Sequence, residues 1–127
     1  MKIVVTGARG LLGWHAAARL HALNCAARFE GKTPPYDLVL LDHAAFQDAG
    51  RLQSAVSGAD AILHFAGVNR APDDDIEGAN PAIAEQLLAA CRQAGASAHI
   101  VYANTIHAGS DTPYGRSKRR AGEMLAA

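Results

Sequence analysis

The sequence predicts an α/β protein built on a doubly wound parallel sheet. Short apolar segments alternate with longer segments of helical periodicity along the whole chain. The short segments are apolar at successive positions, which is typical of parallel strands covered by helices on both faces. A glycine-rich turn separates the first strand from the first helix. At 127 residues the chain is expected to form one domain, 1–127, with right-handed crossovers.

The first strand is expected at 2–6, because this segment is short, β-branched and ended by a glycine. A helix is expected over 11–23, and Asn24 can end it. The inward face of this helix is predicted to carry Leu12, Ala16, Leu20 and Leu23. Residues 25–36, with their pair of prolines, are expected to be irregular.

Two further strands and a helix are expected in the middle of the chain. A second apolar strand covers 37–41 and ends at Asp42. Asp48 can cap a helix that runs to Val56, because its side chain accepts hydrogen bonds from the first-turn amides. A turn at 58–60 then leads into a third strand at 61–65.

The last third of the chain is expected to hold two helices around a fourth strand. Three consecutive acids, Asp73 to Asp75, are predicted to form a loop facing water. The helix after it should run from Pro81 to Gln93, with the proline in its first turn and Gly95 at its end. The fourth strand is placed at 99–103 and the last helix at 114–126.

Composition excludes several classes of partner and site. The formal net charge is zero, and no aromatic residues are interleaved with the basic cluster at 116–120, so nucleic acid is not an expected partner. No apolar run spans a bilayer and no secretion signal is present, so a cytoplasmic location without membrane attachment is expected. Cys25 and Cys91 fit reduced packing residues. The six histidines show no ligand spacing, and no metal site is expected.

The segment Thr6-Gly7-Ala8-Arg9-Gly10-Leu11-Leu12-Gly13 has the features of a phosphate-binding turn. Glycines let a backbone approach a pyrophosphate closely, and the helix that follows offers free N–H groups and a partial positive charge. A strand before and a helix after supply the required context. The spacing GxxGxxG differs from the commoner dinucleotide fingerprint, and an ordinary glycine-rich turn is the alternative interpretation.

The acid at the end of the second strand suggests which dinucleotide would bind. Asp42 can hold the adenosine ribose hydroxyls and would repel a 2′-phosphate. Its separation from Gly13 exceeds the usual spacing, and the loop containing the prolines can account for the excess. NAD is therefore the expected cofactor, with NADP as the alternative because His43 is adjacent. A solvated aspartate at a strand end is the simpler interpretation.

Tyr114 and Lys118 lie four residues apart and share one face of the last predicted helix. A phenol ionises near pH 10, so acid–base work near neutrality requires a neighbouring ammonium that favours the phenolate. Thr105, after the fourth strand, can bond a substrate oxygen as charge develops on it, and Asn104 is the alternative. A core tyrosine beside a solvated lysine remains the simpler interpretation.

These motifs resemble the extended short-chain dehydrogenases/reductases, the nucleotide-sugar epimerase/dehydratase group, over nearly the whole chain. TGARGLLG is similar to that family's TGxxGxxG, and ADAILHFAG at 59–67 is similar to one of its strands. Asn80 occupies the place of an asparagine in the following helix, and YGRSK at 114–118 matches YxxxK. HFAGVNR at 64–70 and NTIHAGSDTPYGRSK at 104–118 resemble the reductase/epimerase branch of capsular polysaccharide and deoxysugar synthesis.

The resemblance implies a Rossmann-like NAD(P)-binding domain with a catalytic triad of Thr105, Tyr114 and Lys118. Threonine stands where serine is commoner, and the family's third strand looks compressed into 44–48, where Asp48 would keep an adenine contact. By comparison with the family, the lobe that grips the sugar nucleotide is expected to be missing. The residues expected to bind the cofactor are Gly7, Arg9, Gly10, Leu11, Leu12, Gly13, Asp42, His43, Phe65, Ala66, Gly67, Tyr114 and Lys118.

The function implied is that of an NAD(P)-dependent oxidoreductase or epimerase that acts on a nucleotide sugar by hydride transfer. Two alternatives stay open. One is a non-catalytic dinucleotide-binding module or an inactive fragment. The other is an interaction domain, because the helices expected at 81–93 and 114–126 resemble the pair through which this family forms homodimers.

Overall fold

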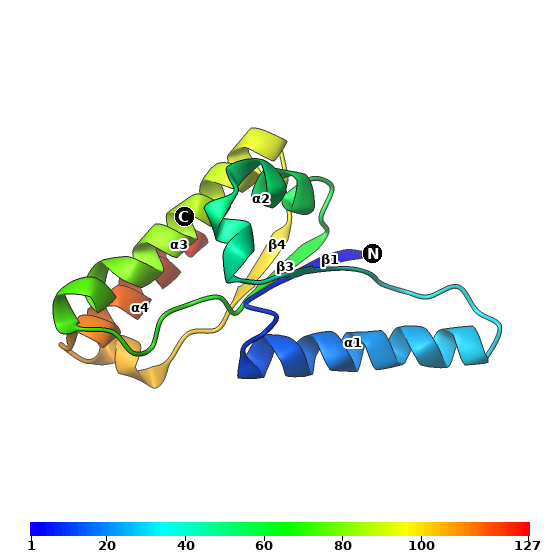
Figure 1. The fold of residues 1–127 in the computed structure, drawn as a ribbon, viewed down its shortest axis with the longest axis horizontal. Coiled ribbons are helices and arrows are strands. Elements are labelled where there is room, and N and C mark those ends of the chain that lie inside the picture. Colours follow the sequence, from blue (N-terminus) through cyan, green and yellow to red (C-terminus); the bar gives the residue numbers. More distant parts are fainter.

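Four parallel strands form one sheet in the order β2-β1-β3-β4 (Figure 1). The computed structural model describes the backbone of residues 1–127 and all side chains except that of Asp74. The strands are β1 Lys2–Thr6, β2 Asp37–Leu41, β3 Ala61–His64 and β4 His99–Tyr102. The predicted parallel α/β class is confirmed, and each strand lies within one residue of its predicted end.

Helices cover both faces of the sheet. Helix α1, Leu11–Phe29, lies on one face, and α2, Ala49–Val56, and α3, Asp73–Ala94, lie on the other (Figure 1). Helix α4, Pro113–Ala126, runs beside α3. Short 3-10 helices η1, His43–Gln47, and η2, Ile106–Gly109, follow β2 and β4. This arrangement confirms the doubly wound topology.

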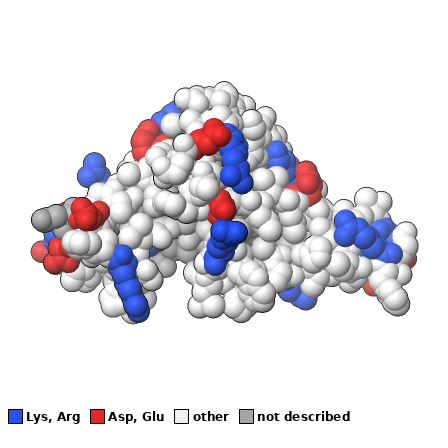
Figure 2. Space-filling view, viewed as in Figure 1, with Lys and Arg blue, Asp and Glu red and all other residues white. Residues whose placement is uncertain are grey.

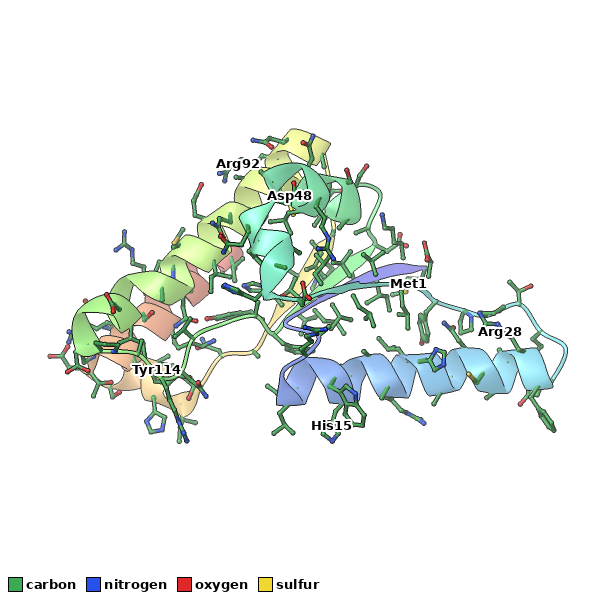
Figure 3. The ribbon with its side chains drawn as sticks, viewed as in Figure 1. Met1, His15, Arg28, Asp48, Arg92 and Tyr114 are labelled. Carbon is green, nitrogen blue, oxygen red and sulfur yellow. The ribbon has the colours of Figure 1, made fainter. Side chains whose placement is uncertain are left out.

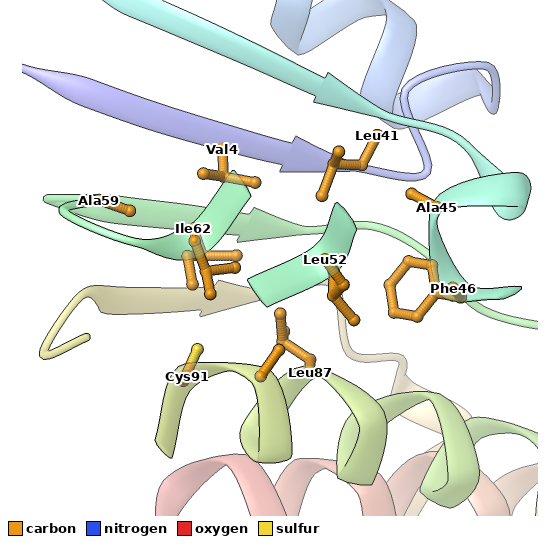
Figure 4. Close-up of a cluster of buried hydrophobic side chains, with 11 residues drawn as sticks. Val4, Leu41, Ala45, Phe46, Leu52, Ala59, Ile62, Leu87 and Cys91 are labelled. Atoms are coloured by element: carbon orange, nitrogen blue, oxygen red, sulfur yellow. The ribbon is translucent and has the colours of Figure 1, made fainter. Parts of the chain in front are cut away.

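The hydrophobic core lies between the sheet and helices α2 and α3 (Figure 4). Ile62 of β3 is fully buried and packs in one cluster with Leu52 of α2 and Leu87 of α3. Cys91 completes the α3 side of the cluster, and burial raises the pKa of its thiol. Cys25 is exposed on α1, so only one of the two cysteines is the packing residue predicted.

Helix α1 is longer than predicted because Asn24 does not end it. The buried Asn24 side chain donates to the Tyr36 carbonyl and accepts from the Tyr36 N–H, at 2.8 and 3.0 Å. The residue expected as a helix stop therefore fastens the following loop, and the helix continues to Phe29. The predicted inward face is also rotated, since Leu12 is 58% exposed while Ala17 is buried.

Helix α3 begins earlier than predicted and contains Pro81 in its interior. The acids Asp73 and Asp75 belong to its first turn rather than to a loop, and negative charge there favours the helix. The side chain of Asp74 lies outside the described part of the chain. A proline removes one helical hydrogen bond. Burial of Ile76 and Ala84, on either side of Pro81, stabilises the helix where this hydrogen bond is missing. Gly95 ends α3 with a φ of +60°, as predicted.

The surface carries no segregation of charge on the side that Figure 2 shows. Lysine and arginine side chains are interspersed with aspartate and glutamate, and neither sign gathers into a continuous patch (Figure 2). Among the described residues, no helix combines the length and the apolar character needed to cross a membrane.

Candidate functional site

Two adjoining cavities open at the edge of the sheet where the parallel strands end. Their volumes are about 420 and about 490 Å³, and they share a wall made of the turn after β1 and the segment after β3. The shared lining residues are Gly7, Gly10, Phe65, Gly67 and Val68. Strand order reverses beside β1, and open α/β sheets bind ligands in the crevice at such a point.

Only glycine fits at Gly7. Its φ of +66° is a conformation that other residues rarely adopt, and a Cβ there would lie 2.7 Å from both Ala66 N and Phe65 C. A Cβ at Gly13, one turn into α1, would overlap the Gly7 carbonyl oxygen. The glycine spacing thus brings the turn against both the β3 segment and the start of α1, and leaves a narrow backbone-lined cradle.

The N-terminus of α1 faces this cradle with its amides uncapped. Gly10 is the N-cap residue and has no side chain to accept from them, and the first turn contains no acid. The first amides of a helix have no partner within it, and they carry the positive end of its dipole. The first turn, with Leu11 and Leu12 lining the second cavity, therefore suits an anion such as a pyrophosphate.

Asp42, at the end of β2, contributes a carboxylate to the first cavity. Its Oδ1 is buried without a hydrogen-bond partner among the described residues. Its other oxygen lies 3.9 Å from the Nε of Arg9, whose side chain is 87% exposed. A buried oxygen that lacks a donor readily accepts a hydrogen bond from a ligand hydroxyl. The cradle and this oxygen together fit the pyrophosphate and ribose of a dinucleotide.

Much of the first cavity comes from residues that the sequence analysis missed. His43 and Ala66 were expected, but most of the remaining wall lies on η1 and α3. These additional residues are Phe46, Gln47, Ala79, Ala82, Ile83 and Gln86. No local motif marks them, because they meet only when α3 packs beside η1. Asp48 does not line this cavity, and its side chain accepts from the Arg51 N–H at 3.0 Å as the cap of α2 (Figure 3).

The second cavity brings together Thr105, Tyr114 and Lys118. The Thr105 hydroxyl accepts from the His107 N–H at 3.3 Å, which leaves its own proton free to donate. Tyr114 stands in the first turn of α4, which the Thr112 side chain caps (Figure 3). Asn104 lines the same cavity and accepts from the Thr105 N–H, so it positions the loop.

Lys118 is a buried cation, with 7% of its surface exposed. Its Nζ donates to the Ala103 carbonyl at 2.7 Å and lies 4.0 Å from the centre of the Tyr102 ring. Burial lowers the pKa of the Lys118 ammonium to about 8. A lysine that retains its proton near neutrality but holds it less firmly than usual is suited to a site of proton transfer.

His64, at the end of β3, is buried beside Thr6 of β1. Its Nδ1 lies 2.8 Å from Thr6 Oγ1, which accepts from the Ala66 N–H at 3.2 Å. Burial first, and then the Lys118 charge, lower the pKa of His64 to about 4, so the imidazole is neutral at pH 7. This chain of contacts fixes the segment after β3, which forms the wall that both cavities share.

Except for Asp48, all residues that the sequence assigned to the site line at least one of the two cavities. Asp42, His43, Arg9 and Ala66 line the first, and Thr105, Tyr114, Lys118, Leu11, Leu12 and Gly13 line the second. Their binding and catalytic roles stay predictions. The sequence analysis gave no site role to Val68 and Asn69, although both lie in the HFAGVNR segment at 64–70.

Similarities to known proteins cover the whole of this site. The model of the NAD dependent epimerase/dehydratase family matches residues 3–126. A UDP-2-acetamido-2,6-beta-L-arabino-hexul-4-ose reductase of Pseudomonas aeruginosa is 32% identical over 98% of this chain, which spans 31% of that protein.

Solved structures show the same architecture. The capsular polysaccharide assembling protein CapF of Staphylococcus aureus is 29% identical, with a TM-score of 0.73, over 99% of this chain and 31% of its own. The dTDP-glucose 4,6-dehydratase DesIV of Streptomyces venezuelae is 22% identical, with a TM-score of 0.72, over 98% of this chain and 50% of its own, and supports the fold. The chain thus belongs to the NAD dependent epimerase/dehydratase family and spans about a third of the length of its curated relative.

Proposed function

We propose that this chain contains the cofactor-binding and proton-transfer machinery of an NAD(P)-dependent oxidoreductase or epimerase acting on a nucleotide sugar. The observation that carries the proposal is the meeting of Thr105, Tyr114 and Lys118 with the glycine turn around one cavity. These residues come from three separate segments, so their convergence beside an anion cradle argues against a chance YxxxK match.

The cofactor half of the proposal rests on the first cavity and the shared wall. The Gly7, Gly10 and Gly13 backbone and the amides of α1 would bind the pyrophosphate, and Asp42 would accept from the adenosine ribose. Phe65, Ala66 and Gly67 would lie beside the nicotinamide half. When bound, a nicotinamide coenzyme supplies or accepts the electron pair that the reacting sugar carbon requires.

The proton chemistry would come from the chain's own residues. The Tyr114 hydroxyl would exchange a proton with a sugar hydroxyl or carbonyl oxygen, and the Lys118 ammonium would favour negative charge on the Tyr114 oxygen. Thr105, whose hydroxyl proton is not used within the described structure, would donate to the same sugar oxygen and orient it. The Ala103 carbonyl holds the Lys118 ammonium at the floor of this cavity.

The proposed substrate class is supported by the similarity to the curated relative. The name of that protein describes reduction of a UDP-linked 4-keto sugar, and the similarity extends over 98% of this chain. We therefore place UDP-linked keto sugars first among the substrates to be tested, with dTDP-linked keto sugars second. The uncharged side chains of Asn69 and Asn104, which line the second cavity, would offer both donors and acceptors to sugar hydroxyls.

Binding and turnover test the two halves separately. We expect NADH and ADP-ribose to raise the melting temperature of the chain, since a ligand at 100 times its Kd stabilises a protein by about 2.7 kcal/mol. NADH oxidation would then be followed with UDP- and dTDP-linked keto sugars. Replacing Tyr114 by Phe should reduce turnover about 100-fold or more while leaving the ADP-ribose shift unchanged.

The outcomes separate the proposal from its alternatives. No melting shift with any dinucleotide contradicts the proposal as a whole. Binding without turnover of any keto sugar favours a non-catalytic dinucleotide-binding module. Homodimer formation through α3 and α4 stays a separate prediction, which light scattering would measure, and a strict monomer would contradict it.

A further inference from the structure

Tyr102, the last residue of β4, lies beside Lys118, which is the only cation among the described residues that line the second cavity. Its ring centre is 4.0 Å from the Lys118 Nζ, and the neighbouring residue, Ala103, supplies the carbonyl that accepts from the same nitrogen. Neither residue belongs to a motif recognised in the sequence. The end of β4 thus provides both contacts that the structure shows for this ammonium.

No carboxylate with a described side chain contacts the Lys118 ammonium. Among the residues whose side chains the structure describes, none forms an ion pair with Lys118. The titratable groups around it are His64 on β3, Tyr102 on β4 and Tyr114 on α4. A buried ammonium needs compensation for its lost hydration, and an aromatic face within about 6 Å provides it.

The environment of the Tyr102 ring favours a role for its face rather than for its hydroxyl. The hydroxyl oxygen is buried and has no hydrogen-bond partner among the described residues. The His64 imidazole stacks on the ring, with 5.6 Å between centroids and 24° between planes. Since His64 is neutral at pH 7, it holds the ring without adding a second positive charge beside Lys118.

We propose that Tyr102 is a positioning residue, whose aromatic face holds the Lys118 ammonium in place and in its charged form beneath the second cavity. The inference rests on the proposed function only in that Lys118 is taken to assist proton transfer. The electrostatic attraction between ring and ammonium is a property of the chain itself, and it can be measured without cofactor or substrate.

A graded change of the ring tests this attraction without changing its shape. Tyr102 is first replaced by Phe and then by phenylalanines that carry one, two and three fluorine atoms, which progressively withdraw electron density from the ring face. The pKa of each lysine is measured by NMR of the side chains in the full chain. Lys2 and Lys32, whose amines contact Ser57 and Glu30, serve as internal references.

We expect the Phe substitution to leave the Lys118 pKa within a few tenths of its original value. Successive fluorines should then lower that pKa stepwise, by about half a unit or more over the series, while those of Lys2 and Lys32 stay constant. A Lys118 pKa that is the same in all variants overturns the inference, because purely steric packing would not respond to fluorine. The same series at Phe29, which is 95% exposed, controls for the incorporation itself.

The result is independent of the fate of the proposed function. If the chain binds no dinucleotide but the Lys118 pKa follows the fluorine series, the proposed function fails and the role of Tyr102 stands. If dinucleotides bind but the Lys118 pKa shows no trend over the fluorine series, the proposed role of Tyr102 fails and the proposed function stands. Melting curves of each variant establish that the fold is retained.

Discussion

The side chain of Asn80 is hydrogen-bonded to both backbone polar groups of Val68. Its Oδ1 accepts from the Val68 N–H and its Nδ2 donates to the Val68 carbonyl, both at 2.9 Å. The same Nδ2 donates to the Ser117 hydroxyl at 3.1 Å. One buried amide therefore joins the loop after β3 to helices α3 and α4. Because Val68 lines both cavities, Asn80 determines where their shared wall lies.

Replacing Asn80 by Ala should lower the free energy of unfolding by about 2 kcal/mol or more, since it leaves polar groups of Val68 and Ser117 without partners. It should also weaken ADP-ribose binding. Urea unfolding and thermal shift would measure the two effects. Asn69→Ala is the matched control, because Asn69 is exposed, and its stability should stay within about 0.5 kcal/mol of the original. Equal effects of the two substitutions would contradict the assignment.

Replacing Gly7 by Ala should lower the free energy of unfolding far more than the same change at Gly31. Both residues have positive φ, +66° and +72°, so both substitutions carry the backbone strain of about 1 kcal/mol. At Gly31 a Cβ meets nothing within 4 Å, whereas at Gly7 it would collide with the backbone of Phe65 and Ala66. Chemical denaturation and dinucleotide binding of both variants would be compared, and similar stabilities would argue against a tight cradle.

Stability should fall as the pH drops from about 6.5 towards 4, because of His64. Its pKa is lowered from 6.5 to about 4 in the folded chain, so the unfolded chain binds the proton first in this window. The loss amounts to about 3 kcal/mol across the window. When urea unfolding is measured from pH 4 to pH 7, the free energy of unfolding of the His64→Gln variant should depend less steeply on pH than that of the original chain. His99→Gln, at an exposed site, should keep the original slope, and a change there instead would contradict the assignment.

Replacing Asp42 by Ala should narrow the preference for NADH over NADPH. The carboxylate would repel a 2′-phosphate, and its removal would leave Arg9, now 3.9 Å away, free to approach that group. We expect the ratio of the two dissociation constants to change about fivefold or more. Titration calorimetry would measure both constants. Asp37→Ala, at the opposite end of β2, is the charge-matched control and should leave the ratio unchanged.

Local patterns in the sequence were sufficient for the order of the elements and for the glycine turn. Buried parallel strands are apolar at successive positions, and Gly7 is required by a backbone conformation that is set within its own turn. The position of Asp48 as a helix cap is equally local and was correctly predicted. In contrast, the predicted end of α1 and the predicted start of α3 were wrong. Distant contacts of Asn24 and Ile76 outweigh local stop and loop signals there.

By itself, then, the sequence determined the parallel α/β fold, the family and the motif residues that line the two cavities, because each of these depends on short-range spacing. The tertiary structure alone decided how those residues are supported. The buried amide of Asn80, the neutral His64 and the Tyr102 ring beneath Lys118 become neighbours only after β3, β4, α3 and α4 have packed together. Burial and electrostatics at such a junction depend on groups far apart in the chain, so no local pattern can encode them.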